Sequence, residues 1–514
     1  MWLLLVVVGL VLAALVALTI HDLVQRQHAI VRNFPIVGHL RYWLESVGPE
    51  LRQYIVTDND EERPFNRDQR RWIYSSSKLE NNYFGFGTDN DIEHPKNYLI
   101  IKHLTFPPVP FVAAHGTADG APLPAAKVLG GPAGRAHAFR PASVVNISGM
   151  SFGALSGAAV EAMNRGAALA GCLHNTGEGG ISPHHQHGGE LIWQIGTGYF
   201  GCRDAHGQLS IDRLVEQVER HPVRAIELKL SQGAKPGIGG LLPAAKVTAE
   251  IAAIRGIPVG VACASPPGHT AFHDVDSMLD VVETIAARTG LPVGIKSAVG
   301  DGQLWADLAR RIDETGRTVD FITIDGGEGG TGAAPLVFSD HVSLPFKWGF
   351  SRVYREFAER GLHERVVFVG SAKLGMPENA LLAMVLGCDL IHVGREAMMA
   401  VGCIQAQRCH TDRCPTGVAT QSTWLQRGLD PELKAVRCAN YLMALRMELQ
   451  RLGQVCGHVH PALVTSDAIE VLRDEFRAET VREVFGYEPG WGLPAPADRE
   501  AITALLTQPS EPTP

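Results

Sequence analysis

Three cysteines stand close together late in the chain, in the stretch "GCIQAQRCHTDRCPTG" from Gly402 to Gly417. Cys403, Cys409 and Cys414 have the spacing C-x5-C-x4-C, and a proline follows the last one. Thiolates in close loops, often with a proline after the last, are typical ligands of iron–sulfur clusters. Three thiolates rather than four suit a cluster that lacks one corner iron.

Two other interpretations of this triad stay open. Zinc would need a fourth ligand, and the near candidate His410 adjoins Cys409, so both would have to face one ion. The triad could also be a group of structural thiols, although three in one loop bounded by Gly and Pro are unusual. The odd total of nine cysteines indicates a reducing compartment rather than a disulfide framework.

Polar side chains form a second group that could do chemistry, because they follow short apolar runs. These residues are Ser151, Asn175, Thr176, Glu178, Gln232, Lys235, Lys296, Asp325 and Ser371. In barrel enzymes the catalytic residues gather at the carboxyl ends of the strands. One polar residue at a strand end means little, but polar groups at most of the ends indicate a site.

Eight apolar runs rich in Val and Ile predict the strands that would carry these residues. They cover residues 143–150, 172–177, 225–231, 258–265, 292–300, 319–327, 366–374 and 390–398. Helices are predicted at 154–170, 242–255, 277–289, 302–315, 346–360 and 377–386. Strands that alternate with helices imply a parallel sheet, and eight of them close a (β/α)8 TIM barrel, an α/β fold. An open doubly wound sheet would need a G-x-G-x-x-G turn after its first strand, which is absent.

The first twenty residues, "MWLLLVVVGLVLAALVALTI", contain no charge and would span about 30 Å as a helix. A signal peptide would need a basic start and a small-residue cleavage site, and neither is present. Arg26, Arg32 and Arg41 follow the apolar run, so the positive-inside rule predicts a single-pass anchor in the inner (cytoplasmic) membrane with the catalytic domain in the cytoplasm.

The predicted organisation has four parts. Residues 1–21 form the transmembrane anchor, 22–142 an N-terminal extension and linker, 143–425 the barrel with its iron–sulfur loop, and 426–514 a helical extension with a disordered tail. Within these parts we expect helix pieces in 32–55, an extended connection at 113–141, a long helix at 431–453 and disorder at 507–514. The net charge of −8 argues against nucleic acid as a partner.

Several longer motifs resemble one known family. They are "GMSFGALS" (149–156), "AMNRGAALAGCLHNTGEGG" (162–180), "QGAKPGIGGLLPAAKV" (232–247), "SPPGHTAFHDVDSM" (265–278), "DGGEGGTGAAP" (325–335) and "GCIQAQRCHTDRCPTGVATQ" (402–421). In this order they resemble the FMN-binding synthase domain of the glutamate synthase large subunit, over about residues 143–425. The chain resembles the stand-alone, membrane-anchored members of that family.

The resemblance implies FMN across the barrel mouth and a 3Fe-4S cluster on Cys403, Cys409 and Cys414 that passes electrons to it. Reduced FMN would then reduce the imine formed from 2-oxoglutarate and ammonia, giving L-glutamate. The implied catalytic residues are Lys296, Gln232, Lys235 and Glu178. The implied cofactor-binding residues are Gly149, Met150, Ser151, Asn175, Thr176, Lys296, Asp325, Gly326, Gly327, Gly330, Thr331, Gly370, Ser371, Gly394 and Arg395. No nicotinamide-binding motif is visible, so a ferredoxin-like or membrane electron donor is expected.

Some residues depart from the family pattern. Ile238 stands where the family carries a Glu that faces an ammonia tunnel, and the N-terminus is an apolar run rather than a nucleophilic cysteine. We therefore expect that this chain does not use glutamine by itself. Two alternatives stay open: another oxo acid or imine as the substrate, or a membrane-tethered electron-transfer module without glutamate synthesis.

Overall fold

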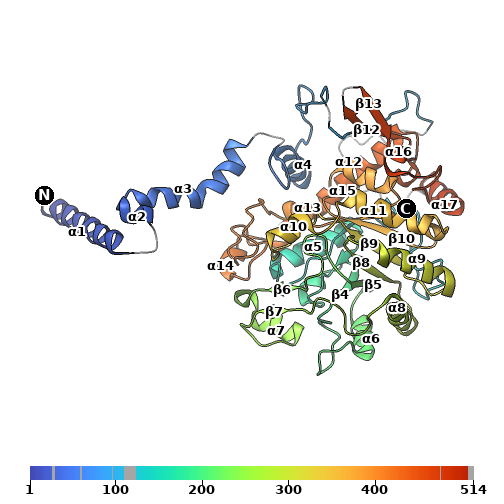
Figure 1. The fold of residues 1–514 in the computed structure, drawn as a ribbon, viewed down its shortest axis with the longest axis horizontal. Coiled ribbons are helices and arrows are strands. Elements are labelled where there is room, and N and C mark those ends of the chain that lie inside the picture. The colour runs from blue at the N-terminus through green and yellow to red at the C-terminus, as the bar shows by residue number, and fades with distance from the viewer. Residues whose placement is uncertain (26–28, 58–60, 95, 109–122, 475, 508–514) are drawn as a thin grey trace, which may run out of the picture. The chain divides into compact units, whose positions relative to one another are not determined.

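Eight parallel strands close into a barrel in the computed structural model, which confirms the predicted (β/α)8 fold (Figure 1). In order around the barrel they are β2 (Val145–Ile147), β3 (His174–Asn175), β4 (Leu191–Ile195), β5 (Val223–Lys229), β8 (Val293–Ser297), β9 (Phe321–Asp325), β10 (Val367–Ser371) and β11 (Leu390–Val393). Because all eight are parallel, their carboxyl ends meet at one mouth.

The structure describes residues 1–25, 29–57, 61–94, 96–108, 123–474 and 476–507. The chain divides into two units, Met1–Arg70 and Arg71–Pro514. Part of the predicted connection at 113–141, and all of the predicted disordered tail except Thr507, lie outside the described residues.

Apolar side chains fill the amino-terminal half of the barrel. This core is made of Ala125, Leu129, Leu173, Ile192, Ala225, Phe321, Val367, Val369 and Leu390, and Phe139 packs against it. The Phe321 ring occupies the place where a Cβ on Gly294 would stand, so the neighbouring strand needs glycine there. The packed core leaves the opposite end of the barrel for polar side chains.

Helices follow most of the strands, and Figure 1 shows them around the barrel. They are α5 (Gly157–Ala170), α6 (Ile211–Arg220), α7 (Ala249–Arg255), α8 (Val275–Thr289), α9 (Gln303–Thr315), α10 (Leu336–His341), α11 (Phe346–Ala358), α12 (Pro377–Val385) and α13 (Arg395–Ala400). Side chains cap several of them; Ser156 accepts a hydrogen bond from the Ala159 amide at the start of α5.

One predicted barrel strand is wrong. Residues 258–265 contribute only β7 (Cys263–Ala264), which pairs antiparallel with β6 (Leu241–Leu242) outside the barrel. The run "LIWQI" takes that place in the barrel as β4, and all five of its residues are buried. The physical reason is side-chain volume: Leu, Ile and Trp fill a barrel wall, whereas "PVGVACAS" offers mostly small residues, of which Val259 and Val261 are exposed.

The C-terminal part packs on the barrel with helices and with a small sheet that was not predicted. The long helix α15 (Pro431–Val455), predicted at 431–453, crosses α5 so closely that a Cβ on Gly166 would stand 2.7 Å from Cys438 Cβ. The antiparallel sheet joins β1 (Tyr98–Ile101), β12 (Ile469–Asp474) and β13 (Arg477–Thr480). The remaining helices are α14 (Thr423–Gln426), α16 (Val481–Phe485) and α17 (Pro496–Thr507).

The first unit is helical, as the sequence predicts. It contains α1 (Trp2–Val24), α2 (Ala29–Asn33), α3 (Gly38–Leu51) and the π-helix Arg52–Val56, and α4 (Arg67–Lys78) runs across the boundary between the units. Among the described residues, α1 alone is long and apolar enough to cross a bilayer. Its most apolar stretch has a mean hydropathy of 3.1, and none of that stretch is buried.

Candidate active site at the barrel mouth

The predicted polar residues lie at the ends of different barrel strands, as expected. Lys296 is inside β8, Asp325 ends β9 and Ser371 ends β10, and all three are buried. The Lys296 Nζ stands 3.6 Å from Asp325 Oδ1, and the other carboxylate oxygen accepts a hydrogen bond of 2.8 Å from the Gly233 amide. Asp325 therefore connects a lysine of β8 to the loop after β5.

Glu178 forms an ion pair that the sequence did not reveal. Lys229, the last residue of β5, donates hydrogen bonds of 2.7 Å to Glu178 Oε1 and 2.5 Å to Gln232 Oε1. Burial alone would raise the pKa of Glu178, but the Lys229 cation, with Lys235 and Arg255 nearby, lowers it below its ordinary value. The predicted catalytic pair Glu178 and Gln232 thus shares one cation.

Lys235 is a second buried cation in this region. It is 4% exposed, and its ammonium makes no hydrogen bond to any residue in the described part of the chain. Burial and the neighbouring Lys229 lower its pKa, and Glu178 partly opposes this shift. A buried ammonium with free donors is suited to an anionic ligand.

Below these residues, Glu227 of β5 anchors a network inside the barrel. Its carboxylate accepts hydrogen bonds from Asn175 Nδ2 (2.8 Å), Gln194 Nε2 (2.6 Å) and Thr323 Oγ1 (2.6 Å). The Asn175 Oδ1 in turn accepts from the Gly177 amide at 3.0 Å. The network orients the side-chain amide of Asn175, a predicted cofactor-binding residue.

His392 of β11 stands in the same buried layer. Burial lowers its pKa to about 4, although Glu227 and Asp325 oppose the shift. Within the described residues, its Nε2 has no hydrogen-bond partner. A buried polar atom without a partner in a protein interior is uncommon and indicates a place for a ligand or a water.

The turns after β2 and β3 pack tightly against each other. An ideal Cβ on Gly149 would stand 2.7 Å from Asn175 Oδ1, and one on Gly177 would stand 2.5 Å from the Ser151 nitrogen. The Thr176 hydroxyl accepts a hydrogen bond from the Gln194 amide at 3.1 Å. Backbone atoms of this predicted cofactor-binding segment can therefore approach a ligand without interference from side chains.

The glycine-rich segment after β9 is held from both sides. Gly326 donates its amide to Ser371 O at 2.9 Å, and Gly327 donates to Leu344 O at 2.9 Å. Arg395 donates to the Glu328 carbonyl and lies against Gly330, so it supports this segment. Thr331 is exposed, and its hydroxyl accepts from the Ala333 amide, so the structure does not bring it to the other predicted residues.

The ends of β10 and β11 form the remaining corner of the mouth. Ser371 and Ser148 bring their hydroxyl oxygens to 3.4 Å of each other. After Gly370 and Ser371 the chain adopts positive φ at Ala372 (133°) and Lys373 (53°), which non-glycine residues rarely do. On the next strand, an ideal Cβ on Gly394 would stand 3.9 Å from the Met150 sulfur. The seventh and eighth strands of (β/α)8 barrels often end in phosphate sites.

The three cysteines lie in one tightly wound loop after α13. All three are free thiols, and the loop contains positive φ values at Gln405, Gln407 and Asp412. Burial, with a smaller contribution from the neighbouring Cys409 and Cys414, raises the pKa of Cys403 to about 12. In the described chain, no three His, Cys, Asp or Glu side chains converge enough to hold a single metal ion.

Lys246 fastens this loop to the barrel. Its buried ammonium donates hydrogen bonds to the carbonyls of Cys409 (2.8 Å), Ala419 (2.8 Å) and Ala154 (3.1 Å). The loop also touches the glycine-rich segment, since an ideal Cβ on Gly332 would stand 3.2 Å from Cys409 Cβ. The thiols are thus adjacent to the segment that leads back to Asp325.

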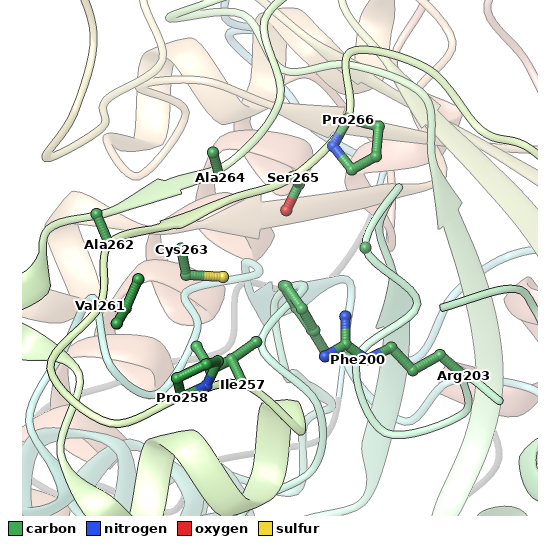
Figure 2. A pocket seen from close by; sticks show the side chains of 11 residues that line it. Phe200, Arg203, Ile257, Pro258, Val261, Ala262, Cys263, Ala264, Ser265 and Pro266 are labelled. Atoms are coloured by element: carbon green, nitrogen blue, oxygen red, sulfur yellow. The ribbon is translucent and has the colours of Figure 1, made fainter. Parts of the chain in front are cut away.

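A cavity of about 170 Å³ lies beside the site, and Figure 2 shows the residues that line it, among them Phe200, Arg203 and Cys263. None of the predicted site residues lines it. Ser265 links the two places, because an ideal Cβ on Gly240 would stand 2.8 Å from Glu178 Oε1 and 3.3 Å from Ser265 Oγ.

Four residues of the site were not among those predicted from the sequence: Glu227, Lys229, Lys246 and His392. A signal was present for the first two: in the predicted strand 225–231 they alternate with apolar residues, so they share a face with Ala225, which is in the barrel core. His392 gave the same signal, because in the predicted strand 390–398 it shares a face with Leu390 of the barrel core, whereas Lys246 gave none.

Known proteins with similar sequences point to one family. Residues 134–459 match the family model described as the conserved region in glutamate synthase. The glutamate synthase large subunit-like protein YerD of Bacillus subtilis is 36% identical over 85% of this chain and 89% of its own length. The archaeal glutamate synthase [NADPH] of Methanocaldococcus jannaschii is 35% identical over 61% of this chain, and the match spans only 59% of that relative.

A mandelate oxidase variant with 2-hydroxy-phenylacetamide matches 80% of this chain and 89% of its own, at 15% identity and a TM-score of 0.39. The family match covers more than half of the chain, and YerD is similar over most of its length. The chain therefore belongs to the glutamate synthase family of oxidoreductases.

Proposed function

We propose that this chain reduces the imine of 2-oxoglutarate and ammonia to L-glutamate, with FMN and a 3Fe-4S cluster as cofactors and an external electron donor. The observation that carries the proposal is the meeting of Lys296, Asp325, Glu178 and Lys235 at a barrel mouth that the thiol loop adjoins through Gly332. The family and the archaeal relative's name support glutamate as the product.

The residues present fit FMN. The close backbone approach at Gly149, the buried Lys296 and His392 Nε2, which has no partner among the described residues, leave polar groups for a flavin ring. Ser371, Lys373 and Gly394 border a corner suited to its phosphate. When bound, FMN supplies hydride transfer. Lys296 would place a cation where reduced flavin carries negative charge.

The thiol loop fits a cuboidal cluster. Each thiolate of such a cluster binds a different iron, so the thiols need not converge on one point as ligands of a single ion do. Cys409 and Cys414 raise the pKa of Cys403, and the Lys246 cation lies near Cys409 and would favour its thiolate. When present, the cluster supplies single electrons.

The substrate would be held by charge. Lys235 is placed to bind a carboxylate of the oxo acid, and Gln232, fixed by Lys229, can donate its amide hydrogens. Glu178 is held ionised beside Lys229, so it can accept a proton at its free carboxylate oxygen. These roles follow from the geometry and stay predictions for each residue.

One observation favours a substrate other than 2-oxoglutarate. Arg395 stands in "GREAM", where the family resemblance has "GTAAL", and it binds the Glu328 carbonyl in the segment that borders the mouth. This arginine would reshape one wall of the site and change which oxo acid or imine fits it.

We also propose that α1 anchors the protein in the inner membrane, with the barrel in the cytoplasm. The support is the length and apolar character of α1 and the arginines Arg32 and Arg41 that follow it. Protease added to intact cells should then leave the barrel intact; digestion from outside would reverse the topology.

The enzymatic test starts from the absorption spectrum of the purified protein, which should show flavin bands and broad iron–sulfur absorption. The flavin is then reduced without oxygen, and oxo acids are added with ammonia. We expect 2-oxoglutarate with ammonia to reoxidise the flavin and yield glutamate. If another oxo acid reoxidises the flavin and 2-oxoglutarate does not, that oxo acid is the substrate. Purified protein without flavin bands would contradict the proposal. Ferredoxin and NADPH are compared as reductants in the same assay.

The cluster has its own test. Cys409→Ser should remove most of the iron and sulfide, whereas Cys202→Ser, a buried cysteine outside the loop, should leave them unchanged. Equal iron content in the Cys409→Ser variant and the parent protein would show that the loop holds no cluster.

A further inference from the structure

Helix α3 of the first unit carries an uncovered apolar face. Leu40, Trp43 and Leu44 of the helix are exposed by 54%, 59% and 47%, its last residue Leu51 by 42%, and Val37 directly before it by 70%. The spacing of three and four residues places these side chains on one side of the helix. Arg41 and Glu45 lie on another side and form an ion pair of 2.9 Å. A soluble surface rarely exposes so many large apolar side chains in one stripe.

A polar clasp holds the start of this helix to the end of α1. The Asp22 side chain near the end of α1 is fully buried. It accepts hydrogen bonds from the Ile36 amide (2.9 Å) and from His39 Nε2 (2.9 Å to Oδ1). Two helices of the same unit are therefore joined by a buried carboxylate rather than only by the intervening chain.

The neighbouring helix identifies what covers the apolar face. α1 is itself an uncovered apolar helix, and its most apolar stretch has a mean hydropathy of 3.1. If α1 crosses a bilayer, as proposed above, the clasp places the start of α3 where the chain leaves the hydrocarbon. Trp and Tyr are enriched at that depth, and α3 carries Tyr42 and Trp43.

We infer that α3 lies along the bilayer surface, with Val37, Leu40, Trp43, Leu44 and Leu51 between the lipid headgroups and acyl chains. This inference rests on the proposed anchoring by α1. The polar side chains of α3 carry both signs of charge, so apolar burial provides the binding rather than attraction to anionic lipid. The Asp22–His39 clasp fixes the angle at which the chain turns from spanning the membrane to lying on it.

The experiment uses the full chain in vesicles of phosphatidylcholine that contain a phospholipid with a photoreactive group near its headgroup. After illumination, mass spectrometry maps the labelled peptides. We expect label on α1 and on residues 38–51, and none on α17, an equally peripheral helix of the second unit. In Trp43→Asn/Leu44→Asn the label on α3 should fall about tenfold, because apolar burial is lost. Ser46→Asn, on the polar side of α3, should leave it unchanged.

The clasp is tested separately with Asp22→Asn/His39→Ala, which should lower the label on α3 and leave that on α1 intact. Label on α1 without label on α3 in the parent protein would overturn the inference while the anchor stands. Absence of label from both helices would refute the anchor and the inference together. Cross-links from α3 to a second copy in place of lipid would show that a protein covers this face, and would also overturn the inference.

Discussion

At the barrel mouth, some charged residues are paired with neighbouring side chains, and others are available to bind a ligand. Lys229 is occupied by Glu178 and Gln232, and Asp325 is shared between Lys296 and the Gly233 amide. Lys235 is buried without such a partner in the described chain. Charge that is already paired orients its neighbours, while unpaired buried charge is costly until a ligand arrives.

Replacement of Lys235 should therefore act on substrate binding. We expect Lys235→Gln to raise the KM for the oxo acid by about 30-fold, equivalent to about 2 kcal/mol, because one charge-assisted hydrogen bond is lost. The flavin content should not change. Lys102→Gln, at a surface ion pair with Glu470, is the control. An unchanged KM in the reoxidation assay would show that Lys235 does not bind the substrate.

Glu227 is expected to matter through the residues that it orients. Glu227→Gln places an amide where three donors converge, so at least one of Asn175, Gln194 and Thr323 loses its acceptor. The free energy of unfolding should fall by about 3 kcal/mol, and flavin should be retained less well. Glu470→Gln, a carboxylate at the surface, should change stability by less than about 1 kcal/mol. Equal losses in both variants would contradict this role.

At the scale of elements, the thiol loop is held by a residue that lies far from it in the sequence. Lys246 follows β6, yet it binds carbonyls at Ala154, Cys409 and Ala419, so one ammonium joins three segments. A loop with several positive φ values needs such support, because its backbone conformation is not favourable by itself.

Lys246→Met should loosen this loop without removing a thiol. The three carbonyls lose their donor, so we expect the iron content to fall and the thiols to react faster with an alkylating reagent, since burial now slows them. Lys434→Met is the matched control, because Lys434 lies beside Gly402 at the start of the loop. If the thiols of Lys246→Met react no faster than those of the parent protein, the loop keeps its conformation without Lys246.

At the scale of the whole molecule, several histidines are buried as neutral imidazoles. Burial lowers the pKa of His392 and His460 to about 4 and that of His174 to about 3. His460 is fixed as one tautomer, because Nε2 donates to Pro124 O at 3.0 Å and Nδ1 accepts from the Ala462 amide at 3.1 Å. These groups link folding to pH across the molecule.

The sign of this linkage follows from proton uptake. Below about pH 6.5 the unfolded chain protonates these histidines while the native state keeps them neutral, so stability falls as the pH falls toward 4. Each contributes a slope of about 1.4 kcal/mol per pH unit. Denaturant unfolding between pH 7 and pH 5 should show this decline, and His460→Gln should reduce the slope by about one histidine's share. His94 is exposed, so His94→Gln should leave the slope unchanged. Equal slopes in the parent protein, His460→Gln and His94→Gln would contradict the prediction.

Much of this molecule could be predicted from the sequence, because the signals are local. The thiol triad, the short apolar runs of seven barrel strands and the uncharged N-terminal run are all patterns of neighbouring residues. The alternation in residues 225–231 could also have pointed to Glu227 and Lys229. The family motifs placed these patterns in one order, and the barrel and the family are both confirmed.

Only the tertiary structure decided which residues face one another. The choice between 191–195 and 258–265 as a barrel strand depends on which run fills the wall, and both are short and apolar. Gly233 meets Asp325 across 92 positions, and Lys246 meets Cys409 across 163. Periodicity tells which side of an element a residue takes, but it carries no information on the partner across the barrel, because that partner is set by closure of the sheet and by the packing of its loops.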